Sequence, residues 1–273
     1  MTEQAERYDR IAAGYAQWWA PVIAPAALRV LDAIEPVIAA GATDLLDVGT
    51  GTGTLAIAML QRWPQIRVTA IDASSGMVDT AGSEADRILS AQQRSRLLFR
   101  VAFADDLGVA DRSFDLAVSS FVLQLVPNRF RALREAHRVL RPGGRFVWVS
   151  WLAHDGPWAP DDDFDDALEE VGEERREWFD RPGDLASPGA AAAQMRRAGF
   201  ADVVATEGLL DHPFDVDGYV GFMSEFDEED LIQNLPEDVR ERFDAALRRR
   251  LGRRQPSDLA LRLPTVLVSG VRR

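Results

Sequence analysis

The chain of 273 residues contains no cysteine, no lysine and only three histidines. The absence of cysteine excludes disulfide bonds, thiolate metal sites and a cysteine nucleophile. The histidines, at 137, 154 and 212, leave little for a histidine-built centre, so we expect no metal site. No stretch approaches the roughly 18 apolar residues that a membrane-spanning helix needs, and the start, MTEQAERYDR, does not resemble a secretory signal. We therefore expect a soluble, cytoplasmic protein with no membrane partner.

Positive charge is also scarce, and its balance changes along the chain. The 31 basic residues, all arginine, face 44 acidic residues, which gives a net charge of −13. Residues 1–150 carry 16 acids and 16 arginines, so the whole excess of negative charge belongs to residues 151–273. Such a chain repels a phosphate backbone, and no concentrated basic face is visible. A nucleic-acid partner is therefore not expected.

Short apolar runs alternate with helical patterns in the first half of the chain. The runs cover residues 44–48, 66–71, 97–102, 114–119 and 145–151, and helices are expected at 52–62, 74–90 and 128–140. Runs that are apolar on both faces are typical of parallel strands covered by helices on both sides. This alternation of strands and helices predicts an α/β, doubly wound sheet that binds its ligand at the carboxyl ends of the strands. A helix at 187–198 and strands at 200–210 and 263–271 complete seven strands.

Two helical inserts interrupt the second half of the chain. We expect an N-terminal helical lid at 1–40 and a Rossmann-like core at 41–152, which continues at 187–210 and ends with a last strand at 261–273. The two cap inserts are expected at 153–186 and 211–260. Residues 155–180 hold 12 acids and two arginines around a stripe that includes Phe164, Leu168 and Trp178. This spacing favours a solvated helix face, and we expect the arginines at 248–250, 253 and 254 to pair with its acids.

The strongest local signal is a glycine-rich turn after the first strand, DVGTGTGT at residues 47–54. Glycines there allow a ligand to approach the backbone closely. A dinucleotide fingerprint, G-x-G-x-x-G, would place glycine at Thr54, whereas the spacing found is D-x-G-x-G-x-G. The carboxylate of Asp47 would accept a hydrogen bond from a cationic ammonium or from the loop itself.

Acidic residues follow the next two strands as well. Asp72 ends the second strand, in the position from which a carboxylate binds both ribose hydroxyls. Asp105 and Asp106 follow the third strand, where a carboxylate accepts from an adenine amino group. Each acid alone would be a helix cap or a solvated loop residue. Together, acids at three neighbouring strand ends predict a site for an adenosine that carries a positive substituent.

Over residues 8–151 the chain resembles class I S-adenosylmethionine-dependent methyltransferases, within the broad small-molecule group that includes the quinone-biosynthesis enzymes. The motifs are YDRIA from residue 8, LDVGTGTG from 46, IDASSGM from 71, FADDLGVADRSFDLAVSS from 103 and RVLRPGG from 138. The resemblance implies a Rossmann-like, mostly parallel seven-stranded sheet with an antiparallel last strand. It also implies S-adenosylmethionine as the methyl donor and S-adenosylhomocysteine as the product.

The resemblance further implies which residues contact the methyl donor. The glycine loop would face the methionine part, Asp72 the ribose, and Asp105 the adenine, with a backbone N–H from Asp106 or Leu107. The full set is Tyr15, Asp47, Gly49, Thr50, Gly51, Gly53, Asp72, Ala73, Met77, Asp105, Asp106, Leu107 and Ser119. Relatives often carry a histidine pair after the fourth strand, where this chain reads LQL at 123–125. That departure leaves Gln124 as a contact to the acceptor at most.

Methyl transfer from a sulfonium mainly requires that the acceptor atom be aligned with the C–S bond, and it requires a base only if the acceptor must lose a proton. His154, beyond the fifth strand, and Tyr15, in the lid, are the candidate bases. The alternatives are an exposed loop residue for His154 and a contact to the carboxylate end of the donor for Tyr15. Trp19 and Trp151, with Gln124, are the candidate acceptor contacts, and core packing is the alternative for both aromatic residues.

We therefore expect an enzyme that methylates O, N or C of a small-molecule acceptor, as a monomer or homodimer. A nucleotide-binding module without turnover stays open because the histidine pair is missing. A nicotinamide-dependent oxidoreductase, which would bind a dinucleotide, is the other alternative. If some acids of residues 155–180 turn inward, they would select a cationic or amine-bearing acceptor.

Overall fold

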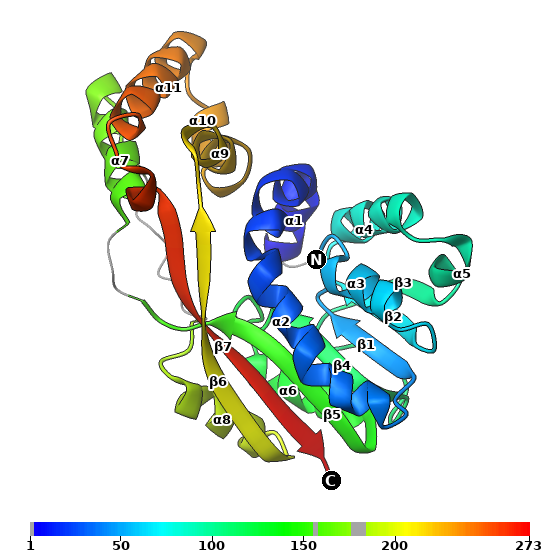
Figure 1. The fold of residues 1–273 in the computed structure, drawn as a ribbon. Helices are drawn as coiled ribbons and strands as arrows, with labels where there is room; N and C mark the ends of the chain where they lie inside the picture. Colours follow the sequence, from blue (N-terminus) through cyan, green and yellow to red (C-terminus); the bar gives the residue numbers. More distant parts are fainter. Residues whose placement is uncertain (1–2, 155–157, 176–183) are drawn as a thin grey trace.

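The computed structural model describes residues 3–154, 158–175 and 184–273, and a seven-stranded sheet lies at its centre (Figure 1). The strand order is β3-β2-β1-β4-β5-β7-β6. The first five strands pair in parallel, whereas β7 runs antiparallel to both β5 and β6. The bounds are β1 (Asp44–Val48), β2 (Arg67–Asp72), β3 (Leu97–Val101), β4 (Phe114–Ser120), β5 (Leu140–Trp151), β6 (Phe200–Pro213) and β7 (Ala260–Arg272). The predicted fold class is confirmed.

Helices cover both faces of the sheet, as the apolar character of the strands predicted. One face carries α2 (Ala20–Ala39), α3 (Thr54–Arg62) and α4 (Ser75–Ile88), with the short α5 (Ala91–Arg94) beside α4, and the other carries α6 (Arg129–Val139) and α8 (Pro188–Arg197). In α4, α6 and α8 a side chain caps the first turn. Ser74, Asn128 and Ser187 accept from the N–H groups of Met77, Arg131 and Ala190 respectively.

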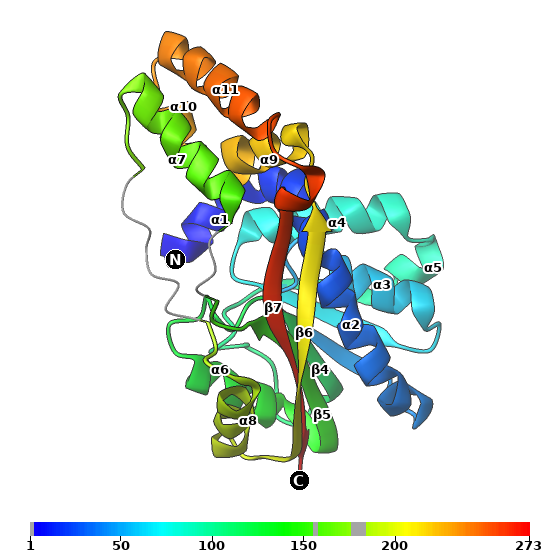
Figure 2. The same cartoon turned by 60° about the vertical axis from the view of Figure 1, so that its left-hand side comes forward.

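The strands β6 and β7 extend beyond the rest of the sheet. The pairing of β5 with β7 ends at Trp151, opposite Thr265, whereas β6 and β7 stay paired as far as Pro213, opposite Ala260. This two-stranded arm carries α9 (Val216–Phe222), the π-helical turn η2 (Met223–Asp227), α10 (Glu229–Gln233), α11 (Glu237–Leu251) and the 3-10 turn η3 (Pro256–Asp258) (Figures 1 and 2). His212, within the range expected for the second cap insert, therefore lies in β6.

Helix α7 (Ala159–Val171), from the first insert, packs against α11 from the second, and we call these two inserts the cap. The stripe expected in the first insert is present, since Phe164, Ala167 and Leu168 are fully buried, while Trp178 lies outside the described residues. The acids of α7 meet arginines of α11 and of the segment after it, in the pairs Arg249–Glu170 (2.6 Å), Arg250–Asp166 (2.7 Å) and Arg254–Asp163 (2.8 Å). The expected pairing between these two segments is confirmed at those positions.

The N-terminal segment lies between the cap and α4 (Figure 1). It consists of α1 (Glu3–Gly14), the π-helical turn η1 (Tyr15–Trp19) and then α2. The carboxylate of Asp9 accepts hydrogen bonds from the Ser74 hydroxyl (2.6 Å) and from the Gly76 N–H (2.8 Å), which fixes α1 on the first turn of α4. Within the described part of the chain, no helix combines the length and the apolar character needed to cross a membrane.

Candidate functional site

A cavity lies at the carboxyl ends of β1, β2, β3 and β4, where a doubly wound sheet binds its ligand. It encloses about 1130 Å³, its open mouth included. Its lining comes from Tyr8 and Tyr15, from the inner side of α2, from the glycine loop, and from the ends of β2 and β3. The end of β4 and the segment after it contribute Ser120, Phe121, Val122, Leu125, Val126 and Pro127. None of the lining residues that the structure describes belongs to the cap.

The glycine loop approaches the cavity because its backbone adopts conformations that other residues avoid. Gly49, Gly51 and Gly53 have φ angles of 72°, 55° and 88°. A Cβ atom on Gly49 would also collide with the side chain of Val122. The N–H groups of Gly49 and Thr50 donate to the Ile71 carbonyl at 2.7 and 2.9 Å, which fastens the loop to the end of β2.

The carboxylate of Asp72 faces the cavity in a fixed orientation. One of its oxygens accepts from the Gly51 N–H at 2.8 Å and the other from the Ser74 N–H at 3.0 Å. Burial raises the pKa of Asp72, and these backbone hydrogen bonds oppose that rise. Each oxygen keeps acceptor capacity for a ligand hydroxyl, because an ionised carboxylate offers about four lone-pair positions.

Asp47 supports the loop from behind. Its side chain is buried, accepts a 2.8 Å hydrogen bond from the Thr50 hydroxyl and lies outside the cavity lining. Burial raises the pKa of this carboxyl to about 7, an effect that the hydrogen bond from Thr50 partly offsets. The sequence allowed two hydrogen-bond donors to Asp47, a ligand ammonium or the loop itself. In the structure the donor is the loop residue Thr50.

The structure brings together eight of the residues expected around the methyl donor. Those that line the cavity are Tyr15, Gly49, Thr50, Gly51, Asp72, Ala73, Met77 and Asp105. Asp47, Gly53, Ser119, Asp106 and Leu107 lie outside the lining.

Three of the residues outside the lining have partners within the protein. The hydroxyl of Ser119 donates to the Val48 carbonyl at 2.8 Å. The N–H groups of Asp106 and Leu107 donate to the Phe103 carbonyl (3.0 Å) and to the Glu135 carboxylate (3.2 Å). The expected backbone donor to adenine is therefore already engaged at both positions.

The candidate acceptor contacts and His154 also lie outside the lining. The Gln124 side-chain carbonyl accepts from the Ser150 hydroxyl at 2.8 Å, which holds it against β5. Trp19 stacks on Phe226 with ring centroids 5.7 Å apart. His154 is exposed, because the two residues before it pair with Leu185 and the chain then leaves the sheet. The structure thus gives His154 no contact with the cavity.

Tyr15 is the one candidate base that lines the cavity. Its hydroxyl lies 3.8 Å from where a Cβ atom on Gly51 would stand, so it faces the glycine loop. Burial first, and then the neighbouring Tyr8 and Asp72, raise the pKa of Tyr15 above its usual range. The group therefore stays neutral and is able to donate a hydrogen bond, which favours a contact to the methyl donor over a role as a base.

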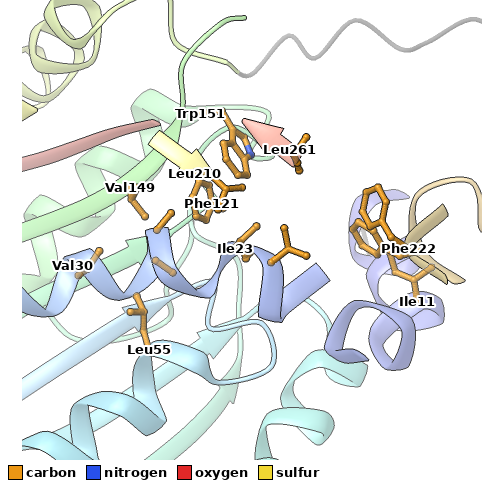
Figure 3. Packing of buried hydrophobic residues seen from close by; sticks show 14 of the residues in the cluster. Ile11, Ile23, Val30, Leu55, Phe121, Val149, Trp151, Leu210, Phe222 and Leu261 are labelled. Atoms are coloured by element: carbon orange, nitrogen blue, oxygen red, sulfur yellow. The ribbon is translucent and has the colours of Figure 1, made fainter. Parts of the chain in front are cut away.

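The lining also contains residues that sequence reasoning missed, above all the segment after β4. Phe121 has a φ of 54°, which is rare for a bulky residue, and its N–H donates to the Val149 carbonyl at 2.9 Å. Its ring stacks on that of Trp151, with centroids 4.0 Å apart (Figure 3). The apolar run FVLQLVP at 121–127 was the available signal, but it reads equally well as core packing.

Comparisons with known proteins agree with this geometry. Residues 46–148 match the model of a family described as a methyltransferase domain. Residues 46–148, which run from β1 to β5 and include the glycine loop, are therefore similar to class I S-adenosylmethionine-dependent methyltransferases. A ubiquinone/menaquinone biosynthesis C-methyltransferase of Geotalea daltonii is 36% identical over 104 residues, which are 38% of this chain and 43% of that protein. A malonyl-[acyl-carrier protein] O-methyltransferase of Geobacter sulfurreducens is 34% identical over 124 residues, 44% of each chain.

The chain thus spans about half the length of the curated relatives that it matches. Among solved structures, phosphoethanolamine N-methyltransferase 2 of Haemonchus contortus has a TM-score of 0.60 at 15% identity, covering 100% of this chain and 60% of that one. The YcgJ protein of Bacillus subtilis has a TM-score of 0.57 at 20% identity, covering 87% and 96%. At these identities the likeness concerns the methyltransferase fold alone.

Proposed function

We propose that this methyltransferase-family protein transfers a methyl group from S-adenosylmethionine to a small-molecule acceptor. The observation that carries the proposal is the cavity in which the glycine loop and the oriented Asp72 carboxylate meet. When bound, S-adenosylmethionine supplies an electrophilic methyl group on a positively charged sulfur. The chain's own residues would bind the donor, orient it and exclude water from it.

The lining fits such a donor part by part. Asp72 would accept from the ribose hydroxyls, and Asp105, at the end of β3, from the adenine amino group. Met77 and Ala73 supply apolar surface beside the adenine position, and the neutral Tyr15 hydroxyl would donate to the carboxylate of the methionine part. A dinucleotide fingerprint, which a nicotinamide enzyme would need, is absent from the sequence.

We also propose that residues 1–40 are a lid and that the cap, none of whose described residues lines the cavity, holds this lid closed. Two π-helical turns meet at the junction, and such turns are frequent at functional sites. The Trp18 indole N–H donates to the Glu225 carboxylate at 2.7 Å, and the Tyr15 ring packs edge-on against Phe226 at 5.6 Å. Since Tyr15 lines the cavity, the cap would act on the site through the lid.

A cytoplasmic location and a monomeric or homodimeric state stay predictions.

Isothermal titration calorimetry with S-adenosylhomocysteine tests the binding part of the proposal. Asp72→Ala should weaken binding by about 1–3 kcal/mol, since it removes charge-assisted hydrogen bonds to the ribose. Asp79→Ala, which removes an exposed acid of α4, is the matched control and should leave the affinity unchanged. Equal affinities for the two variants would refute the assigned site.

Turnover and ligand preference separate the alternatives. Labelled S-adenosylmethionine incubated with a broad acceptor panel should give a methylated product. Binding of S-adenosylhomocysteine with no product from any acceptor would favour the module without turnover. Thermal stabilisation by NAD but not by S-adenosylhomocysteine would favour the oxidoreductase and contradict the proposal.

A further inference from the structure

We infer, on the basis of the proposed function, that the methyl acceptor is an amine with an apolar body that reacts as its free base. The inference concerns five apolar residues of the lining, which we call the acceptor wall. It consists of Ile23 and Ala27 of α2 and of Phe121, Val122 and Leu125 after β4. Three observations carry the inference, namely the charge of the lining, the rigidity of the wall, and the absence of a base from the described lining residues.

The charge of the lining excludes an anionic acceptor. Among the lining residues that the structure describes, the ionisable ones are Tyr8, Tyr15, Asp72 and Asp105, so none carries a positive charge. Arg7 places its guanidinium 5.9 Å from the centre of the Tyr8 ring but is not part of the lining. A carboxylate or phosphate at the acceptor wall would lose its water without gaining a cationic partner from the described lining residues. A cation or a neutral molecule meets no such penalty.

The acceptor wall is apolar and held in one conformation. The backbone of Phe121 occupies the left-handed region, and a bulky residue stays there only where its surroundings impose it. The hydrogen bond to Val149 and the stacking on Trp151 provide that constraint. Figure 3 shows the two rings side by side, close to Ile23 of α2. A fixed aromatic face of this kind suits an apolar body and stabilises a positive charge beside it.

The described lining residues provide no base for an acceptor that must lose its proton. Tyr15 stays neutral because it is buried, Asp72 and Asp105 are assigned to the donor, and His154 lies outside the cavity. An alcohol would therefore have no group to accept its proton, whereas a neutral amine attacks with its lone pair. The N–C bond forms as the C–S bond breaks, the positive charge moves from sulfur to nitrogen, and the product ammonium later gives its proton to water.

Binding of three probes to the complex with S-adenosylhomocysteine tests the inference without turnover. Phenethylamine, 2-phenylethanol and phenylacetate share one apolar body and differ in the reacting group. By calorimetry at a pH near the pKa of the amine, phenethylamine should bind about tenfold more tightly than phenylacetate. Equal or tighter binding of phenylacetate would overturn the inference.

Turnover supplies a second test through its pH dependence. With phenethylamine, kcat/KM should rise with pH up to the pKa of the acceptor itself, because only the free base attacks. A ring-matched amine of lower pKa should shift the rise to a correspondingly lower pH. If kcat/KM rises at the same pH for both amines, a protein group acts as the base and the inference is wrong. Faster methylation of 2-phenylethanol than of phenethylamine would also contradict it.

A charge placed on the acceptor wall should change the preference. Leu125→Arg adds a cation to the lining, and it should lower the affinity for phenethylamine relative to phenylacetate by about tenfold. Leu98→Arg introduces the same residue at a half-exposed position of β3 outside the lining and is the matched control. An unchanged preference in Leu125→Arg would overturn the assigned wall.

Two failures remain distinguishable. A protein that binds S-adenosylhomocysteine but neither binds nor methylates phenethylamine overturns the amine inference alone. A protein that does not bind S-adenosylhomocysteine at all refutes the proposed function as well.

Discussion

Replacing Asp9 by alanine should release α1 from the first turn of α4. The carboxylate of Asp9 is the point at which α1 meets the first turn of α4, through the Ser74 hydroxyl at 2.6 Å and the Gly76 N–H at 2.8 Å. Gly76 permits this approach, since a Cβ atom there would lie 3.0 Å from the Asp9 carbonyl oxygen. Ser74 is also the residue whose N–H orients Asp72. The contact therefore couples the position of α1 to the Asp72 carboxylate, which is the proposed contact to the ribose.

The size of the effect follows from these two hydrogen bonds and from the helix terminus. A buried hydrogen bond to a charged group contributes about 1.5–3 kcal/mol, and a negative charge at a helix N-terminus about 0.3–1 kcal/mol. Asp9 is only half-buried, so solvent screening reduces the sum to about 1.5 kcal/mol. That free energy corresponds to about a tenfold larger population of molecules with α1 undocked.

Limited proteolysis measures this population directly. Trypsin cleaves after Arg7 and Arg10 of α1 only when the helix undocks, and mass spectrometry identifies the fragments. Asp9→Ala should be cleaved there about tenfold faster than the parent protein, and Asp9→Asn, which keeps an acceptor oxygen, at an intermediate rate. Glu6→Ala removes an exposed acid from the same helix and should leave the rate unchanged.

The pH dependence of the same contact has a definite sign. The hydrogen bonds from Ser74 and Gly76 lower the pKa of Asp9, so the stabilisation is complete above the pKa of the unfolded state, about 4, and is lost as the pH falls through the lowered value. The cleavage rate of the parent protein should therefore not vary because of Asp9 at neutral and alkaline pH. Equal cleavage of Asp9→Ala and Glu6→Ala would refute the reasoning.

Three further predictions concern the loop and the cap. Gly49→Ala should abolish binding of S-adenosylhomocysteine in calorimetry, because the new Cβ collides with the segment after β4, whereas Gly143→Ala, with a similar positive φ but open space around it, should not. Asp47→Asn should raise the Tm relative to the parent protein, and by more at about pH 8 than at about pH 5. Burial raises the pKa of Asp47 to about 7 in the folded protein, so the parent loses stability as the pH rises from about 4 through 7, whereas the uncharged asparagine does not. Arg254→Ala should lower the free energy of unfolding by about 2–4 kcal/mol in urea titration, because buried Asp163 loses its partner.

Each of these predictions has a control or a contradicting result. Arg253→Ala, one position before Arg254 and exposed, should leave stability within about 0.5 kcal/mol of the parent. A Tm difference between Asp47→Asn and the parent that is the same at both pH values would show that Asp47 is ionised in the folded protein. Retained binding in Gly49→Ala would mean that Val122 moves aside without disturbing the site.

The sequence alone predicted the parts that depend on local pattern. Strands that are apolar on both faces fixed the α/β class, and the spacing of the glycines after β1 predicted the position of the loop. Asp72 and Asp105 both reached the cavity, because the carboxyl ends of parallel strands share one edge whatever the rest of the chain does. The acidic face of α7 was equally predictable from its 3.6-residue period.

The tertiary structure decided the contacts between segments far apart in the chain. Asp9 accepts a hydrogen bond from Ser74, which lies 65 residues further along the chain. The ring of Trp151 stacks on that of Phe121 because β4 and β5 are neighbours in the sheet. His154 lies near the site in the sequence but is exposed, since the chain turns away after β5. Periodicity and motifs report which way a residue faces within its own element. Which element lies opposite is set by the packing of the whole chain. Among the described residues, this packing gave the cavity a lining from the N-terminal segment, the segment after β4 and the strand ends of the core, and none from the cap.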